Sequence, residues 1–213
     1  MKIFIDFDDV IFNTKKFNLY LRDFYDLHGI DQELIQKHYY DPDDNSKVKL
    51  FDSEGLFSRL EKYEKINTKN LRENFTEYIK DLSSFIFDDV ENFLIGVGRE
   101  NVYLVSFGLP VFQNEKITGA GINKLVSGCI VTRGLKSEAV QQVITKMNID
   151  HKEKMIFIDD RVEHVEDIKK VFHDMTTLFL CRKEGRYCDQ KNEYCDHEVH
   201  NLKEAQEIIS KMK

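Results

Sequence analysis

The chain has 213 residues, enough to bury a full core, and it fits one domain or one domain with an insertion. Hydrophobic residues make up 41% and charged residues 32%, as in ordinary globular proteins. The formal net charge of −7 disfavours general nucleic-acid binding but not small phosphorylated ligands, because local cations can oppose the global sign. No apolar run approaches the roughly 20 residues that cross a bilayer, and no signal peptide is evident. We therefore expect a cytoplasmic protein with reduced cysteines and no membrane contact.

The first half of the chain predicts one strand followed by helices. Ile3-Phe4-Ile5 is a short apolar run that ends in carboxylates and predicts a buried strand. Residues 15 to about 92 then show apolar positions at helical spacing in three segments: 17–28, 56–63 and 71–82. The run 41–46, Asp-Pro-Asp-Asp-Asn-Ser, predicts a turn between them.

The second half of the chain alternates between predicted strands and predicted helices. Buried strands are predicted at 102–105, 130–132, 156–158 and 177–180, and helices at about 111–120, 136–147, 162–172 and 202–212. Such alternation is typical of βαβ units. We predict an α/β fold with a parallel sheet of at least five strands, in which a helical insertion separates the first strand from the rest.

Polar and mostly acidic side chains follow three of these strands. They are Asp6, Asp8 and Asp9 after the first, Ser106 after the second, and Asp159 and Asp160 after the strand 156–158. Ligands of open parallel sheets bind beyond the carboxyl ends of the strands, so we expect these groups to meet. A single aspartate could cap a helix or fill a turn. Two carboxylate clusters that each close an apolar run repel one another unless a cation compensates, which favours a Mg²⁺ site.

The run 6–11, Asp-Phe-Asp-Asp-Val-Ile, resembles the first motif of the haloacid dehalogenase-like (HAD) superfamily, in which an Asp-x-Asp pair follows a hydrophobic strand. Ser106, Lys136 and the run 156–160 resemble the second, third and fourth motifs, and all four occur in the family's order. The resemblance implies a Rossmann-like parallel core formed by residues 1–13 and 93–213. It also implies an inserted α-helical cap domain, residues 14–92, that closes over the site and selects the substrate.

The activity that the resemblance implies is a Mg²⁺-dependent phosphohydrolase acting on a small phosphate monoester through an aspartyl-phosphate. Asp6 would be the nucleophile and Asp8 the general acid and base. The phosphoryl oxygens would be held by Ser106, Phe107, Gly108 and Lys136.

The same resemblance implies the metal ligands. They would be Asp6, Asp8 through its backbone carbonyl, Asp160 and, as an alternative, Asp159. Two positions depart from the family's pattern: Asp9 stands where the family often has glycine, and His164 stands where it often has another acid. The first departure concerns the local turn, and the second concerns the outer metal ligands.

Other readings stay open at this stage. A phosphomutase or a dehalogenase of the same superfamily would keep the nucleophile, but a dehalogenase has less need of Mg²⁺, so Asp8 and Asp160 favour phosphate chemistry. A non-catalytic HAD-like binding module would be marked by loss of the nucleophile, and Asp6 is present. A receiver-type signalling domain is disfavoured by the helical insertion. The sequence identifies neither the substrate nor the oligomeric state.

Two further groups of residues have ambiguous roles. In the cap, residues that could face the site are Lys15, Lys16, His28, His38, Tyr39 and Tyr40, with Phe12 and Asn13 placed just past the nucleophile. Near the C-terminus, Cys181, Cys188 and Cys195 precede His197 and His200. Their spacing differs from the short Cys-x₂₋₄-Cys of common zinc sites, so we expect a surface loop with free thiols.

Overall fold

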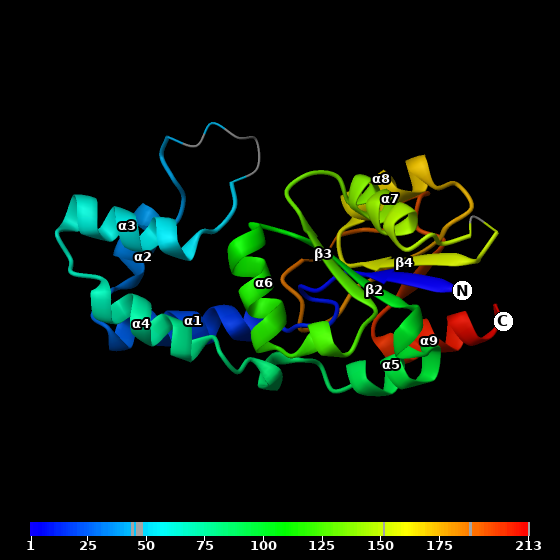
Figure 1. The fold of residues 1–213 in the computed structure, drawn as a ribbon, viewed down its shortest axis with the longest axis horizontal. Coiled ribbons are helices and arrows are strands. Elements are labelled where there is room, and N and C mark those ends of the chain that lie inside the picture. The colour runs from blue at the N-terminus through cyan, green and yellow to red at the C-terminus, as the bar shows by residue number, and fades with distance from the viewer. Residues whose placement is uncertain (44, 46–48, 151, 188, 213) are drawn as a thin grey trace.

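The computed structural model describes residues 1–43, 45, 49–150, 152–187 and 189–212 (Figure 1). Its strands are β1 Lys2–Ile5, β2 Val102–Phe107, β3 Gly128–Thr132, β4 Met155–Asp159, β5 Thr176–Leu180 and β6 His197–Val199. They form one sheet in the order β3-β2-β1-β4-β5-β6, and every pair is parallel. The predicted α/β fold with a Rossmann-like parallel sheet is confirmed.

Helices alternate with the strands of the sheet and also fill the segment between β1 and β2. The helices are α1 Thr14–Leu27, α2 Gln32–His38, α3 Ser53–Glu64, α4 Lys69–Tyr78, α5 Val90–Val97, α6 Pro110–Gly119, α7 Lys136–Lys146, α8 Val162–Val171 and α9 Leu202–Ser210. Short 3₁₀ helices occur at Ser83–Phe85, Arg99–Asn101 and Ile122–Lys124. No helix in the part of the chain that the structure describes has both the length and the apolar character of a membrane span.

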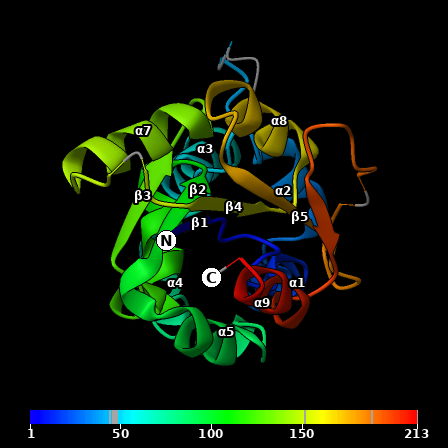
Figure 2. The ribbon, with the colours of Figure 1, turned by 90° about the vertical axis from the view of Figure 1, so that its right-hand side faces the viewer.

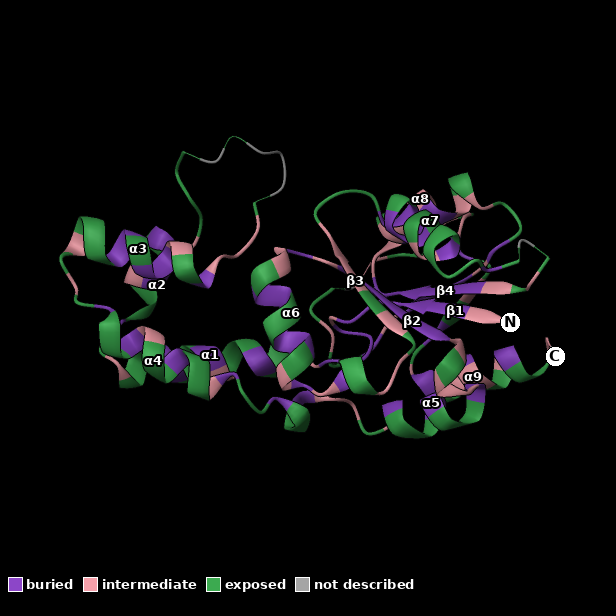
Figure 3. Cartoon of the chain, in the orientation of Figure 1, coloured by how far each residue is buried: buried purple, intermediate pink, exposed green. Residues whose placement is uncertain are grey.

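The sheet is covered on both faces, as parallel sheets require. Helices α7 and α8 lie on one face and α5 and α9 on the other (Figure 2). Alternate residues of a strand point to opposite faces, so Phe4 packs in the cluster under α7 and α8, whereas Ile3 and Ile5 belong to the cluster on the other face. The strands are accordingly buried along most of their length (Figure 3).

The register of the sheet aligns the strand ends that carry polar groups. Ile5 pairs with Leu104 of β2 on one side and with Ile158 of β4 on the other. One residue further along, Asp6 and Asp159 are therefore level at the carboxyl edge of the sheet. The two aspartates are aligned because the apolar runs of β1 and β4, which are visible in the sequence, are similar in length and pair in register.

Helices α1–α4 lie together beyond this carboxyl edge, to the left of the sheet in Figure 1. Their interior is aromatic: the ring of Phe75 lies 5.5 Å from that of Phe24 and 5.3 Å from that of Phe57. The two connections to the sheet pair with each other, since Phe12 and Ile86 form an antiparallel bridge. The predicted boundary at residue 92 falls inside α5, which packs on α9 under the sheet. The division into a core and a cap domain stays a prediction.

Some elements differ from the expectation. Helix α2 and strand β6 were not predicted, because α2 is short and β6 has only three residues, two of them polar. Leu27 was assigned to an apolar face but is 80% exposed at the end of α1. The predicted turn 41–46 includes residues 44 and 46, and the cysteine-rich segment includes Cys188; these three residues lie outside the described ranges.

Candidate active site

The nucleophile candidate begins a tight loop at the end of β1. The Asp6 amide still donates to Ile158 O at 2.9 Å, so its backbone continues the ladder of the sheet. The chain then turns, and the Asp9 amide donates to Phe12 O at 2.8 Å. Asp9 has a φ of 56°, in the left-handed region that glycine adopts most easily and that aspartate tolerates better than most residues. This explains why a glycine fits the family's pattern here and why Asp9 can replace it.

Lys136, at the start of α7, lies between two carboxylates. Its Nζ is 2.6 Å from Asp6 Oδ1 and 2.6 Å from Asp159 Oδ2, and the lysine side chain is fully buried. Burial raises the pKa of Asp6 to about 6, against the opposing charge of Lys136. Burial would also raise the pKa of Asp159, but Lys136 and His164 together lower it to about 2. Asp159 is therefore ionised and is already engaged by Lys136 and by His164.

Asp160 is the carboxylate that lacks a cation. It is buried and makes no hydrogen bond or ion pair to any described residue. Oxygen atoms of Asp6, Asp159 and Asp160 all lie within 4.8 Å of one another. Burial and the neighbouring charges of Asp159, Asp6 and Asp9 raise the pKa of Asp160 well above its usual range. A hard divalent cation with oxygen ligands fits this cluster, because it would satisfy Asp160 and relieve the repulsion.

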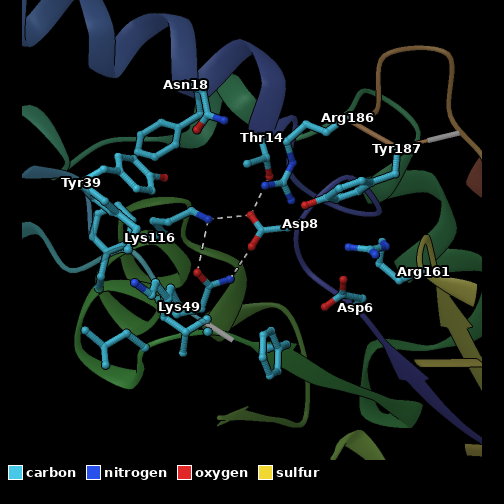
Figure 4. A pocket seen from close by; sticks show the side chains of 18 of the residues that line it. Asp6, Asp8, Thr14, Asn18, Tyr39, Lys49, Lys116, Arg161, Arg186 and Tyr187 are labelled. Carbon is cyan, nitrogen blue, oxygen red and sulfur yellow. Dashed lines mark hydrogen bonds and ion pairs between the residues drawn. The ribbon is translucent and has the colours of Figure 1, made fainter. Parts of the chain in front are cut away.

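Asp8 lies in a separate hydrogen-bonded network (Figure 4). Its Oδ1 accepts from Lys116 Nζ at 2.5 Å and from Thr14 Oγ1 at 2.6 Å, and its Oδ2 accepts from Gln113 Nε2 at 2.7 Å. Burial would raise the pKa of Asp8, but the charges of Lys116 and Arg186 and these hydrogen bonds lower it to about 2. Asp8 is therefore a carboxylate in the free protein.

Helix α6 supplies this network from one face. Gln113 and Lys116 are three residues apart, so both side chains point the same way. Gln113 Nε2 also donates to Ser106 Oγ at 2.7 Å, which joins the second predicted motif to Asp8. The Lys116 ammonium, although buried, lies 5.2–5.8 Å from the rings of Phe7, Phe12, Phe17 and Phe112. Aromatic faces and Asp8 thus replace the water that a buried ammonium loses.

The segment between β5 and β6 closes the other side of the site. Arg182 donates to Val10 O at 3.1 Å through Nε and at 3.0 Å through Nη2, and Arg186 Nε donates to Asp9 Oδ2 at 2.5 Å. The ring of Tyr187 contacts the guanidinium groups of Arg161 and Arg186, at 4.0 and 5.0 Å. These arginines hold the nucleophile loop and place positive charge beside Asp8. Sequence analysis assigned this segment no role.

A cavity of about 1050 Å³ joins these groups to α1, to α2 and to residues 39–40 and 49–51. Of the predicted site residues, those that line it are Asp6, Asp8, Phe107, Gly108, Lys136 and Asp160. Ser106 and Asp159 are fully buried behind this lining; Ser106 contacts it through Gln113, and Asp159 contacts it through Lys136, Arg161 and His164. The structure therefore brings the predicted residues to one place, but in two layers.

The cap candidates divide into two groups. Tyr39 and Tyr40 line the cavity. The others make contacts elsewhere: Lys16 Nζ donates to Ser84 O, His38 contacts Glu64, and Asn13 caps α1 by accepting from the Lys16 amide. Lys15, His28 and Phe12 also fall outside the lining as far as the described residues define it. Four residues that sequence analysis missed, Thr14, Gln113, Lys116 and Arg186, do line it.

Comparisons with known proteins agree with this fold. No protein-family model and no curated protein match the sequence. The structure is similar to that of a HAD-like hydrolase from Burkholderia xenovorans LB400, with a TM-score of 0.74 and 17% identity over 98% of this chain and 96% of that one.

Two more solved structures have different descriptions. A HAD-hydrolase from Bacillus subtilis bound to magnesium has a TM-score of 0.64 and 13% identity over 98% of this chain and 97% of that one. L-2-haloacid dehalogenase from Xanthobacter autotrophicus has a TM-score of 0.63 and 13% identity over 100% of this chain and 99% of that one. At these identities the likeness shows the fold. This chain has the fold of the haloacid dehalogenase-like hydrolases.

Proposed function

We propose that the protein is a Mg²⁺-dependent phosphohydrolase that cleaves a phosphate monoester through an aspartyl-phosphate on Asp6. The observation that carries the proposal is the buried cluster of Asp6, Asp159 and Asp160 with Lys136. A nucleophilic carboxylate facing a phosphate dianion needs its charge, and that of the substrate, compensated at close range. Lys136 alone offsets only part of the negative charge of three buried carboxylates and a phosphate, and a divalent cation would offset more of it.

The geometry favours one of the two candidate metal ligands at the end of β4. Asp159 is engaged by Lys136 and by His164 Nδ1 at 3.2 Å, whereas Asp160 lines the cavity without a partner among the described residues. We assign the metal site to Asp6, Asp160 and the backbone carbonyl of Asp8. Bound there, Mg²⁺ would neutralise charge on the nucleophile and polarise the phosphoryl oxygens.

The protein's own residues carry the rest of the chemistry. Asp6 attacks phosphorus, so that an O–P bond forms as the bond to the leaving oxygen breaks, and the leaving oxygen takes a proton from protonated Asp8. Water then attacks the aspartyl-phosphate, Asp8 accepts its proton, and Asp6 is released with inorganic phosphate. Lys136, which lines the cavity, stabilises the charge on the phosphoryl oxygens, and Ser106 acts through its hydrogen bond with Gln113.

The state of Asp8 constrains this scheme. In the free protein its carboxylate is ionised and paired with Lys116, so it is ready to act as the base of the second step. To act as the acid of the first step it must first gain a proton. The negative charge of a bound phosphoryl group beside Asp8 raises its proton affinity, which is the change this role requires.

A dehalogenase is the second candidate, because several of the similar structures are dehalogenases. That reaction needs the nucleophile but leaves the unpaired Asp160 without a purpose. A phosphomutase would share every residue of the proposed site and would differ in passing the phosphoryl group to a second hydroxyl. The carboxylate cluster therefore favours phosphate over halide chemistry.

The proposal is tested by assaying phosphate release from a panel of phosphorylated metabolites, and chloride release from 2-chloropropionate, with Mg²⁺ and with EDTA. We expect phosphate release only with Mg²⁺ and none from Asp6→Asn. Asp174→Asn, at an exposed position outside the cavity lining, is the matched control and should retain activity. Chloride release without phosphate release, or equal phosphate release in EDTA, would overturn the proposal.

A further inference from the structure

The cavity is far larger than a phosphoryl group. A volume of about 1050 Å³ is at the upper end of pockets that bind whole drug-sized molecules, roughly 300–1000 Å³. The proposed chemistry occupies only the end lined by Asp6 and Lys136. Figure 4 shows Tyr39 and Lys49 on the other side of Asp8 and Lys116 from Asp6, at the end formed by the helical insertion. This cap end has no role in the phosphoryl chemistry, so the residues that line it indicate which kind of leaving group the site binds.

The cap end has an aromatic wall. The ring of Phe51 lies 4.7 Å from that of Tyr39 and 5.0 Å from that of Phe112, and all three residues line the cavity. Unlike the fully buried rings of the helical interior, Tyr39 and Phe51 are only half-buried. Both rings therefore keep exposed surface, and both residues belong to the cavity lining. A flat aromatic ring is the ligand group that best covers such a surface, by stacking or edge-to-face contact.

The same end presents unpaired hydrogen-bonding groups. The residues Asn18, Gln32 and Gln36 are exposed members of the lining, and their carboxamides make no hydrogen bond within the ranges that the structure describes. Tyr25 also contributes to the lining, but its hydroxyl is closed off from solvent and therefore does not face the cavity. Carboxamides pair with amide-like donor and acceptor edges, such as those of nucleobases.

We infer that the cavity binds a nucleoside monophosphate, with its phosphoryl group at Asp6 and its base against the wall of Tyr39, Phe51 and Phe112. This inference rests on the proposed phosphohydrolase function and adds the substrate class. The base supplies an aromatic face for the wall and polar edges for the carboxamides, and the sugar spans the part of the cavity beside Asp8. A simple sugar phosphate would leave the wall uncovered.

The first experiment compares kcat/KM for the four ribonucleoside 5′-monophosphates with that for ribose 5-phosphate, which lacks only the base, in Mg²⁺. Stacking of one base on aromatic side chains is worth roughly tenfold or more in affinity. We expect at least one nucleotide to exceed ribose 5-phosphate by about tenfold. Phe51→Leu, which keeps an apolar side chain, should remove most of that preference for the nucleotide over ribose 5-phosphate. Tyr63→Leu removes an exposed cap aromatic outside the lining and should leave the preference intact.

The second experiment measures binding without turnover. The same five compounds are titrated calorimetrically into Asp6→Asn with Mg²⁺, and into the wild-type protein in EDTA in case that variant does not fold. One outcome is that the nucleotides bind, and Phe51→Leu weakens that binding, while the protein hydrolyses no phosphate ester. That result would refute the proposed phosphohydrolase activity and support the nucleotide site. Hydrolysis of ribose 5-phosphate at the nucleotide rate, or a preference for phenyl phosphate over every nucleotide, would overturn the nucleotide site and keep the phosphohydrolase.

Discussion

Mg²⁺ should stabilise the folded protein at pH 8 and do so much less at pH 5. The reason is that two carboxylates of the proposed metal site have raised pKa values in the free protein: Asp6, about 6 against an ordinary 3.8, and Asp160, well above its usual range. When a folded-state pKa exceeds the unfolded-state value, the stability that it contributes is complete below the unfolded value. That stability is lost as the pH rises through the folded value. The free protein should therefore weaken between about pH 4 and pH 7.

The size of this loss of unfolding free energy follows from the pKa of Asp6. A change in pKa from 3.8 to about 6 corresponds to about 3 kcal/mol at pH 8, and Asp160 adds to it in the same direction. For a chain of this length, 3 kcal/mol corresponds to roughly 6–12 °C in the melting temperature. The lowered pKa values of Asp8 and Asp159, both about 2, contribute stability that is lost only below about pH 4. They do not alter the trend above that pH.

The assay is urea unfolding from pH 5 to pH 8, in EDTA and in saturating Mg²⁺. In EDTA the free energy of unfolding should fall toward pH 8, and Mg²⁺ should restore it there. Asp160→Asn should be more stable than the wild type in EDTA at pH 8, because it removes a buried, uncompensated charge, and it should gain little from Mg²⁺. Asp174→Asn should behave like the wild type. An equal gain from Mg²⁺ at pH 5 and pH 8, or a full gain in Asp160→Asn, would refute the reasoning.

Three more predictions follow from single contacts. Lys136→Met leaves two buried carboxylates without their shared cation and should cost about 3–5 kcal/mol in urea unfolding at pH 8; a loss below 1 kcal/mol would contradict the burial argument. Lys116→Met removes the positive charge beside Asp8 and one of the three donors that hold it, and should lower kcat more than tenfold with KM nearly unchanged, whereas a change in KM alone would indicate a substrate contact. Asp9→Gly should be about 1 kcal/mol more stable than Asp9→Ala, since both lose the pair with Arg186 but only glycine adopts φ 56° freely; equal stabilities would show that this φ carries no strain.

The parts of the fold that local patterns specify were predictable. Each core strand from β1 to β5 is an apolar run that the structure places within about two residues of its expected bounds, because buried parallel strands need apolar residues on both faces. Helix α2 has a local signal that was not used: Asp31 accepts from the Leu34 amide at 2.9 Å and caps the helix. Strand β6 has no such signal, since a three-residue edge strand with two polar side chains owes its form to pairing with β5.

The missing site residues are of a different kind. Lys116 and Arg186 reach the first motif across 108 and 177 positions of sequence. A lysine in a helix with mixed polarity is normally read as solvent-exposed, and α6 has no strong apolar face that would show otherwise. Lys116 is buried because Asp8 and four phenyl rings receive it, and those partners are assembled only by the tertiary fold. Local sequence patterns hold no information on such pairs.

The charge of the site is a second property that local sequence patterns do not predict. The whole chain carries −7, yet the cavity lining among the described residues includes seven Lys and Arg side chains and five Asp and Glu side chains. With Asp9 and Asp159, which pair with Arg186 and Lys136 directly behind this lining, the site is close to neutral inside an acidic protein, and a bound divalent cation would make it positive. A field of this sign draws in a phosphate dianion while the acidic exterior repels long polyanions. The global charge therefore argues against nucleic acid as a partner and is compatible with a single nucleotide as a substrate, and raising the ionic strength should lower kcat/KM for the nucleotide through slower capture.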